Sequence, residues 1–230
     1  MNSYQKTLDQ EQIQAFYHDH FVESQVKDFS KLLGPSIEPA NDKVVDVGGG
    51  CGFFASSLRE YLGLNVRVLD TDPQSISFCR QAGLDARLDD ALDPQIVGDE
   101  SIVCFNLILH HLVGHTDGET LKLQGRALSA WINKTRAIYV NEYIYESFLV
   151  NDFSAWVIYR ITSSSMLSRI GTFVARYIPS LKANTFGVGV RFRSHEQWLR
   201  IFESLGFEVL DTVVGEQEYV SLPRRLLLIK

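Results

Sequence analysis

The sequence predicts an α/β fold in which helices wrap a parallel sheet. Short β-branched runs alternate with segments of helical periodicity between residues 43 and 141, an alternation typical of parallel strands joined by crossover helices. The run 101–109 is almost continuously apolar, as expected of a strand that is covered on both faces. A length of 230 residues is sufficient for one domain with a well-buried core.

A helical segment precedes this alternation. Apolar residues recur at helical spacing over 8–33, and Gly34-Pro35 ends the pattern. We therefore divide the first part of the chain into an N-terminal helical cap at 1–40 and a ligand-binding core at 41–142. The elements expected in the core are strands at 43–47, 65–69, 85–88, 101–109 and 137–141, and helices at 53–62, 73–82 and 119–132.

The alternation pauses after the core and later resumes. Residues 143–193 form an insertion that is rich in aromatic and aliphatic side chains. It also carries six basic residues, namely Arg160, Arg169, Arg176, Lys182, Arg191 and Arg193. Beyond it, Ser194 is a suitable N-cap for a helix that Gly206 ends. We expect two closing strands at 208–214 and 225–229, so that 194–230 form a closing helix and strands.

Composition and charge exclude several classes of function. The formal net charge is −6, whereas proteins that bind nucleic-acid backbones are usually basic. Three widely spaced cysteines give neither a disulfide framework nor a metal-binding pair. The polar start does not resemble a signal peptide, and the longest apolar run is too short to span a bilayer. We expect a cytoplasmic protein without a metal site and without a nucleic-acid partner.

The strongest chemical signal is a glycine-rich turn between the first strand and the following helix. Asp46 is followed by glycines at 48, 49, 50 and 52, which let backbone N–H groups approach a ligand closely. Asp70 lies 24 residues after Asp46, at the end of the next strand, where a carboxylate can accept hydrogen bonds from ribose hydroxyls. An acid beside the turn repels a pyrophosphate and suits an ammonium group. The pattern therefore favours S-adenosylmethionine over a dinucleotide.

Together these motifs resemble those of class I S-adenosylmethionine-dependent methyltransferases, in the type 11/12-like branch that acts on small molecules. The resemblance covers about 44–142 and 194–230. It rests on the glycine-rich stretch 44–58, the acidic strand end at 68–72, the Leu-Asp-Asp-Ala segment at 88–91, the strand with a Leu-His-His exit at 104–112, and the helix–Gly-Phe–strand pair at 194–215.

The resemblance implies a Rossmann-like, doubly wound, mostly parallel sheet of seven strands, with 225–229 as one antiparallel strand. Its donor is S-adenosylmethionine and its product S-adenosylhomocysteine. The first acid and the glycines lie near the methionine part, Asp70 near the ribose, and Asp90, or alternatively Asp89, near the adenine. The residues assigned to the donor in this way are Asp46, Gly48, Gly50, Gly52, Asp70, Asp89, Asp90 and Asn106.

Four further side chains follow the fourth and fifth strands, at the edge where ligands of open α/β sheets bind. They are His110, His111, Glu142 and Tyr143. Histidine titrates near neutral pH and can take a proton from an acceptor hydroxyl. We therefore regard these residues as catalytic candidates and slightly prefer His111, which is the more usual of the pair in similar sequences.

These expectations lead to methyl transfer to a small-molecule acceptor, directed to oxygen or carbon. The insertion suggests an apolar or aromatic acceptor with an acidic group, covered by a helical lid. Two other interpretations of the insertion remain open, a homodimer interface and a basic amphipathic helix on a membrane surface. Two alternative functions also remain, a non-catalytic protein that binds S-adenosylmethionine and an NAD-dependent oxidoreductase.

Overall fold

The structure, a computed structural model, describes residues 19–146, 156, 160, 190–213, 217–219 and 227–229. These residues fall into two compact units. The core unit comprises the described residues up to 108 together with 126–141, and the second unit comprises 109–125 and the described residues from 142 onward. Within the described residues no helix is long and apolar enough to cross a membrane.

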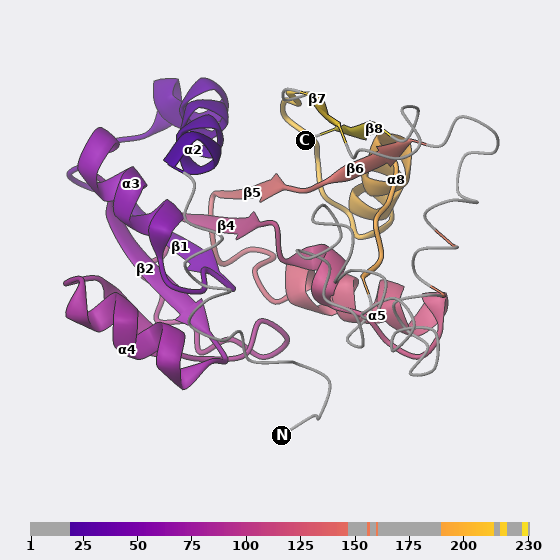
Figure 1. Ribbon diagram of the computed structural model, residues 1–230, viewed down its shortest axis with the longest axis horizontal. Coiled ribbons are helices and arrows are strands. Elements are labelled where there is room, and N and C mark those ends of the chain that lie inside the picture. The colour runs from indigo at the N-terminus through magenta and orange to yellow at the C-terminus, as the bar shows by residue number, and fades with distance from the viewer. Residues whose placement is uncertain are drawn as a thin grey trace, which may run out of the picture. The chain divides into compact units, whose positions relative to one another are not determined.

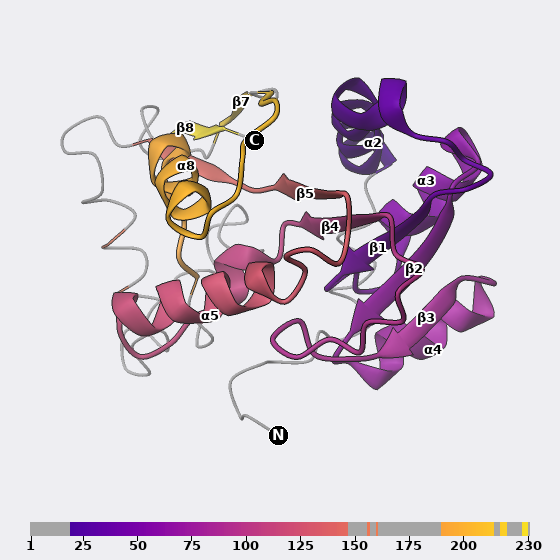
Figure 2. The same cartoon turned by 180° about the vertical axis from the view of Figure 1, so that it is seen from behind.

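The core unit contains a parallel sheet of five strands in the order β3-β2-β1-β4-β5 (Figures 1 and 2). The strands are β1 (Lys43–Val47), β2 (Asn65–Asp70), β3 (Asp85–Leu88), β4 (Ile102–Asn106) and β5 (Ala137–Asn141). The predicted α/β fold with a parallel sheet is therefore confirmed. The order of the strands reverses between β1 and β4, and ligands of open α/β sheets bind beside such a reversal.

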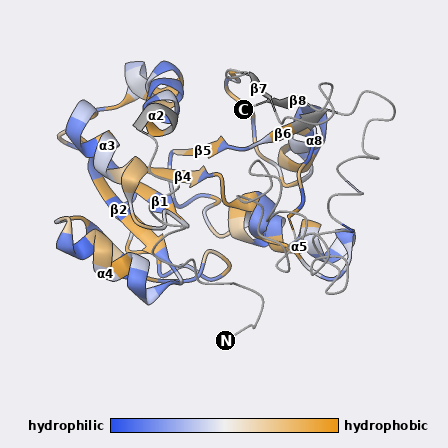
Figure 3. Ribbon diagram, viewed as in Figure 1, coloured by the Kyte–Doolittle hydropathy of each residue, from blue (hydrophilic) through white to orange (hydrophobic). Residues whose placement is uncertain are grey.

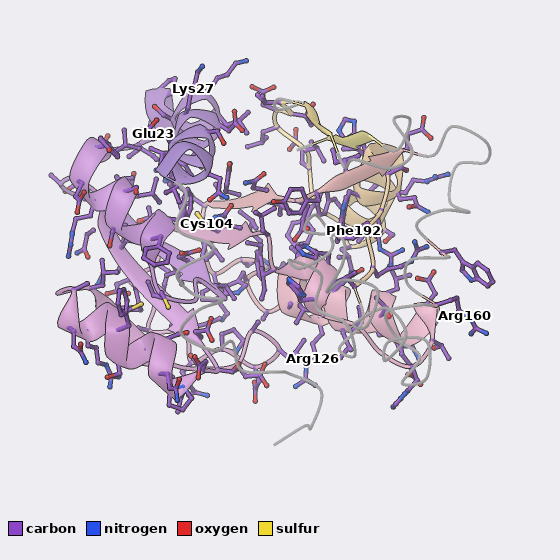
Figure 4. The ribbon with its side chains drawn as sticks, viewed as in Figure 1. Glu23, Lys27, Cys104, Arg126, Arg160 and Phe192 are labelled. Atoms are coloured by element: carbon purple, nitrogen blue, oxygen red, sulfur yellow. The ribbon has the colours of Figure 1, made fainter. Side chains whose placement is uncertain are left out.

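Three helices pack with this sheet around one hydrophobic core. They are α2 (Asp19–Leu33), α3 (Phe53–Leu62) and α4 (Pro73–Gln81). Phe29 of α2 has no exposed surface, and its ring meets those of Phe54 and Tyr139 edge to face. The hydrophobic strands lie inside (Figure 3), whereas Glu23 and Lys27 project outward from α2 (Figure 4).

Two elements of the core end earlier than the sequence predicts. The strand expected to run to residue 109 ends at Asn106, because Leu107 adopts a left-handed backbone with φ 59° and the chain turns into a 3-10 helix at Leu109–His111. Helix α5 (Asp117–Ser129) ends before residue 132. Asn133, with φ 58°, completes the turn that leads the chain back to β5.

The second unit contains helix α8 (His195–Ser204) and a separate antiparallel sheet. Ser194 caps α8 as predicted, in a capping box with Gln197. The sheet has the order β6-β8-β7, formed by β6 (Ile144–Glu146), β7 (Gln217–Tyr219) and β8 (Leu227–Ile229).

The prediction of a strand at 208–214 is wrong for its described residues, because 207–213 form no strand. Residues 208–212 are exposed, and none of the described strands pairs with them. Strand β8 lies inside the predicted strand 225–229 and is antiparallel. The described residues thus give five parallel strands and three antiparallel ones in separate sheets, and the single seven-stranded sheet is not confirmed. Residues 8–18 of the predicted cap and most of the insertion lie outside the described residues.

Candidate functional site

The glycine-rich turn links β1 to α3 through three left-handed backbone conformations. The φ angles are 69° at Gly48, 54° at Gly50 and 75° at Gly52, a region that side chains other than glycine rarely adopt. A Cβ atom at Gly52 would lie 2.6 Å from the side chain of Leu84, whereas one at Gly50 would meet no atom of the described residues within 4 Å. Packing therefore requires glycine at 52, while the backbone at Gly50 is open with respect to the described residues.

Asp46 lies beneath this turn and has no exposed surface. Neither of its carboxylate oxygens has a hydrogen-bond partner among the described residues, and a Cβ atom added at Gly49 would lie 2.8 Å from its Cγ. Burial, and secondarily the charge of Asp70, raise the pKa of Asp46 to about 7. An unpaired buried carboxylate is costly, so this position suits a cationic or hydrogen-bond-donating ligand group.

Asp70 joins the turn to the end of β2. Its carboxylate accepts a hydrogen bond from the N–H of Gly50 at 2.9 Å and from the N–H of Asp72 at 2.8 Å. Burial raises the pKa of Asp70, and the backbone hydrogen bonds oppose that rise. The structure thus places the predicted ribose acid beside the open position of the turn.

The two candidates for the adenine differ in how their carboxylates are used. Both oxygens of Asp89 accept backbone hydrogen bonds, from Asp90 and from Gln95, each at 2.9 Å. Asp90 is exposed, and the N–H of Leu92 donates to one of its oxygens at 2.9 Å. Because Asp89 shapes its own loop, Asp90 is the better placed of the two to accept from a ligand.

The ends of β1, β2 and β3 therefore carry a concentration of negative charge, which we call the acidic edge. It consists of Asp46, Asp70, Asp72, Asp89 and Asp90. In the part of the chain that the structure describes, no Lys, Arg or His forms an ion pair with any of them. Such an edge repels phosphates and attracts cations.

Asn106, predicted at the mouth of the fourth strand, belongs to a chain of amide side chains. Asn141 donates to its Oδ1 at 2.8 Å, and its own Nδ2 donates to Gln25 Oε1 at 2.8 Å. Gln25 and Asn141 are buried, and no sequence motif predicted a role for either of them. The sequence offered two signals for these roles. Asn141 is a polar residue at the end of β5, and Gln25 is a polar residue inside the apolar pattern of α2.

In the second unit, His110 and Glu142 form a buried pair. His110 Nδ1 lies 2.6 Å from Glu142 Oε2, and the N–H of Leu109 donates to Glu142 Oε1 at 2.6 Å. An ionised carboxylate only accepts hydrogen bonds, so beside it Nδ1 carries the proton, and in a neutral ring Nε2 is then the acceptor. A carboxylate that fixes the tautomer of a histidine in this way is a recurrent arrangement of general bases.

The other two catalytic candidates lie beside this pair. The His111 ring is 4.1 Å from that of His110, and Tyr143 meets His110 edge to face at 5.9 Å. Phe192 stacks on His110 at 5.1 Å. Burial, and secondarily His110, hold the pKa of His111 well below its usual value. His111 is therefore neutral at neutral pH, and among the described residues it lacks the carboxylate partner that His110 has.

The basic residues of the insertion divide into three groups. Arg160 is exposed and lies over the Trp156 ring at 5.5 Å. Arg191 and Arg193 are buried and bond to α5. Arg169, Arg176 and Lys182 lie outside the described residues. In the described part, no group of three His, Cys, Asp or Glu residues could hold a metal ion.

Comparison with known proteins connects part of this chain to methyltransferases. No protein-family model matches it. Over 91 residues, 39% of the chain, it is 30% identical to a trans-aconitate 2-methyltransferase of Mycobacterium tuberculosis. An equal match is found in Mycobacterium bovis. The matched segment spans only 35% of the length of these relatives.

Solved structures share the fold at low sequence identity. A putative methyltransferase of Bacillus halodurans gives a TM-score of 0.52 at 16% identity, with 84% of this chain and 71% of that one covered. The [4+2]-cyclase SpnF gives 0.54 at 14% identity, with 84% and 59% covered. A phosphoethanolamine N-methyltransferase of Haemonchus contortus, solved with S-adenosylhomocysteine, gives 0.50 at 14% identity, with 83% and 38% covered. The resemblance to class I small-molecule methyltransferases is thereby confirmed, and SpnF illustrates that this fold does not by itself fix the reaction.

Proposed function

We propose that this protein transfers a methyl group from S-adenosylmethionine to a small-molecule acceptor. The acidic edge beside the open turn at Gly50 carries this proposal. S-adenosylmethionine brings a sulfonium and an ammonium group, both positive, whereas the pyrophosphate of NAD brings negative charge to the same place. The names of the relatives, which include a trans-aconitate methyltransferase, support both the reaction and a small acceptor.

Each donor residue has a role that its surroundings support. Asp46, which is buried and has no hydrogen-bond partner in the part of the chain that the structure describes, is suited to balance the ammonium group near Gly48 and Gly50. Asp70 accepts from the ribose hydroxyls, and Asp90 accepts from the adenine amine. Gly52 keeps the turn in shape, because its position is closely packed, and Asn106 borders the same edge of the sheet.

When bound, the donor supplies an electrophilic methyl group, and the chain's own residues align the acceptor and exclude water. Alignment of two reactants is worth on the order of 7–11 kcal/mol. His110 accepts the acceptor's proton at Nε2, while Glu142 holds Nδ1–H and stabilises the ring that becomes charged. A positioned base adds roughly 10²–10⁴-fold to the rate.

The acceptor atom that fits this arrangement is oxygen or carbon. A hydroxyl or an activated C–H must lose a proton as the new bond forms, and a histidine paired with a carboxylate serves that step. The same proposal includes an apolar or aromatic acceptor that carries an acidic group, with a homodimer interface as the alternative role of residues 143–193.

The test is formation of S-adenosylhomocysteine from S-adenosylmethionine in the presence of a panel of small hydroxy, phenolic and carboxylic acids. We expect acceptor-dependent product, and at least a tenfold slower rate with Glu142→Gln, which keeps the side-chain shape. Binding of the donor without product on any acceptor would favour the second candidate, a non-catalytic donor-binding protein. The fold shared with the cyclase SpnF is the observation that keeps this candidate in view.

A further inference from the structure

A continuous chain of hydrogen bonds in the second unit ends at the His110–Glu142 pair. Arg193 Nε donates to Gln124 Oε1 at 2.9 Å, and Gln124 Nε2 donates to the carbonyl of Leu109 at 2.9 Å. The N–H of Leu109 donates to Glu142 Oε1 at 2.6 Å, and the other oxygen of Glu142 holds His110 Nδ1 at 2.6 Å. Between Arg193 and Leu109, this chain of hydrogen bonds contains no residue to which we assign a contact with S-adenosylmethionine or with the methyl acceptor.

Gln124 occupies a position where an apolar residue is expected. It has no exposed surface, and it lies on the buried stripe of α5 with Thr120, Ala127 and Leu128, which are spaced as one helix face. A buried amide stabilises a protein only when its polar atoms are hydrogen bonded. Leucine or methionine would fill such a position without any need for hydrogen-bond partners. The amide at position 124 therefore indicates that its hydrogen bonds have a role.

The chemistry of its neighbours fixes the orientation of the Gln124 amide. A guanidinium can only donate hydrogen bonds, and a backbone carbonyl can only accept them. The oxygen of Gln124 must therefore face Arg193, and its NH₂ group must face Leu109. Arg193 is itself buried and within 3.4 Å of Asp117, so the donor that orients Gln124 is held from a second side.

Segment 190–193 also contacts His110 directly. The N–H of Arg191 donates to the carbonyl of His110 at 2.9 Å, and Phe192 (labelled in Figure 4) stacks on the His110 ring. The Arg191 side chain pairs with Asp117 of α5 at 2.8 Å. The same short segment therefore supports the backbone and the ring of His110 and also the amide of Gln124.

We propose that Gln124, oriented by Arg193, is a positioning residue for the His110–Glu142 pair. It holds the Leu109 backbone so that its N–H occupies Glu142 Oε1, which leaves Oε2 for His110 Nδ1 and fixes the tautomer with an accepting Nε2. This role rests on the proposed function of His110 as a base, but the tautomer itself can be measured without turnover.

The decisive variant is Gln124→Glu, which preserves volume and the acceptor for Arg193 but places an oxygen against the Leu109 carbonyl. Gln81→Glu, at an exposed position of α4, is the matched control. The tautomer of His110 is read from the ¹⁵N chemical shifts of labelled histidine, with His110→Gln for assignment. We expect Gln124→Glu to reduce the Nδ1–H fraction and to lower kcat about tenfold, with the KM for S-adenosylmethionine within twofold. Gln81→Glu should change neither.

Arg193→Lys is a second test variant, because it keeps the positive charge but removes the Nε donor to Gln124. If circular dichroism shows that Gln124→Glu does not fold, the His110 tautomer and kcat of Arg193→Lys test the proposal instead. A changed tautomer in a variant that folds supports the proposal even if no acceptor is ever methylated, in which case the proposed function fails and the positioning role stands. An unchanged His110 tautomer and kcat in the folded variants would overturn the positioning role.

Discussion

Asp46 makes the stability of the donor-free protein depend on pH. Its pKa rises from 3.8 to about 7 in the folded chain, so the folded state binds this proton more tightly than the unfolded state does. The associated stability is fully present below pH 4 and is lost as the pH rises toward about 7. At about 1.4 kcal/mol per pH unit, the full loss is ~4 kcal/mol.

Asp46→Asn removes the titrating group and preserves the shape of the side chain. The buried amide carries its own desolvation cost of ~1–3 kcal/mol, but this cost does not change with pH. We therefore expect the free energy of unfolding of the variant, relative to wild type, to increase by ~2–3 kcal/mol between pH 5 and pH 8. Urea unfolding at both pH values measures this change.

Val45→Ala, on the neighbouring position of β1, is the control. Val45 is fully buried, so its truncation destabilises the protein without altering a titratable group, and the loss should be equal at both pH values. If the free energy of unfolding of Asp46→Asn differs from that of wild type by the same amount at pH 5 and pH 8, as expected for Val45→Ala, the buried carboxylate does not titrate in this range.

Three further predictions concern binding of S-adenosylmethionine, the stability of the glycine-rich turn and the histidine that acts as the base. Asp70→Ala should weaken S-adenosylmethionine binding at least tenfold by calorimetry while the circular-dichroism spectrum is unchanged; undiminished affinity would remove Asp70 from the ribose. Gly52→Ala should lower the free energy of unfolding by ~2–4 kcal/mol, because the new methyl group meets Leu84 and the left-handed backbone becomes strained; a wild-type urea midpoint would contradict this. His110→Gln should reduce kcat more than His111→Gln does, and the reverse order in steady-state rates would return the role of base to His111.

Local patterns predicted most of the core unit. The β-branched runs and the glycine turn specify β1, α3 and their connection, because strand periodicity and left-handed glycines are properties of adjacent residues. The end of β4 was missed because a left-handed Leu107 has no local sequence signal. The prediction of a strand at 208–214 was wrong for a related reason. A strand needs a neighbouring strand to pair with, and the local sequence pattern does not indicate whether one is present.

The sequence indicated candidate residues for the site but not how these residues pair. The sequence identified His110, His111 and Glu142 as candidates, yet only the folded chain brings Glu142 to His110 across 32 positions. The hydrogen bonds of Gln124 and Gln25 were not predicted. Buried amides bond to residues that are distant in the sequence, and residue spacing along the chain does not encode such pairs.

The proposed function requires that the acidic edge beside the glycine turn binds a cationic nucleoside. Isothermal titration calorimetry of the full chain with S-adenosylmethionine, S-adenosylhomocysteine and NAD tests it most directly. We predict saturable binding of both adenosyl compounds, lost together in an Asp46→Ala/Asp70→Ala variant, and no heat of binding with NAD. Binding of NAD alone, or of none of the three compounds, would show that the acidic edge is not a site for S-adenosylmethionine.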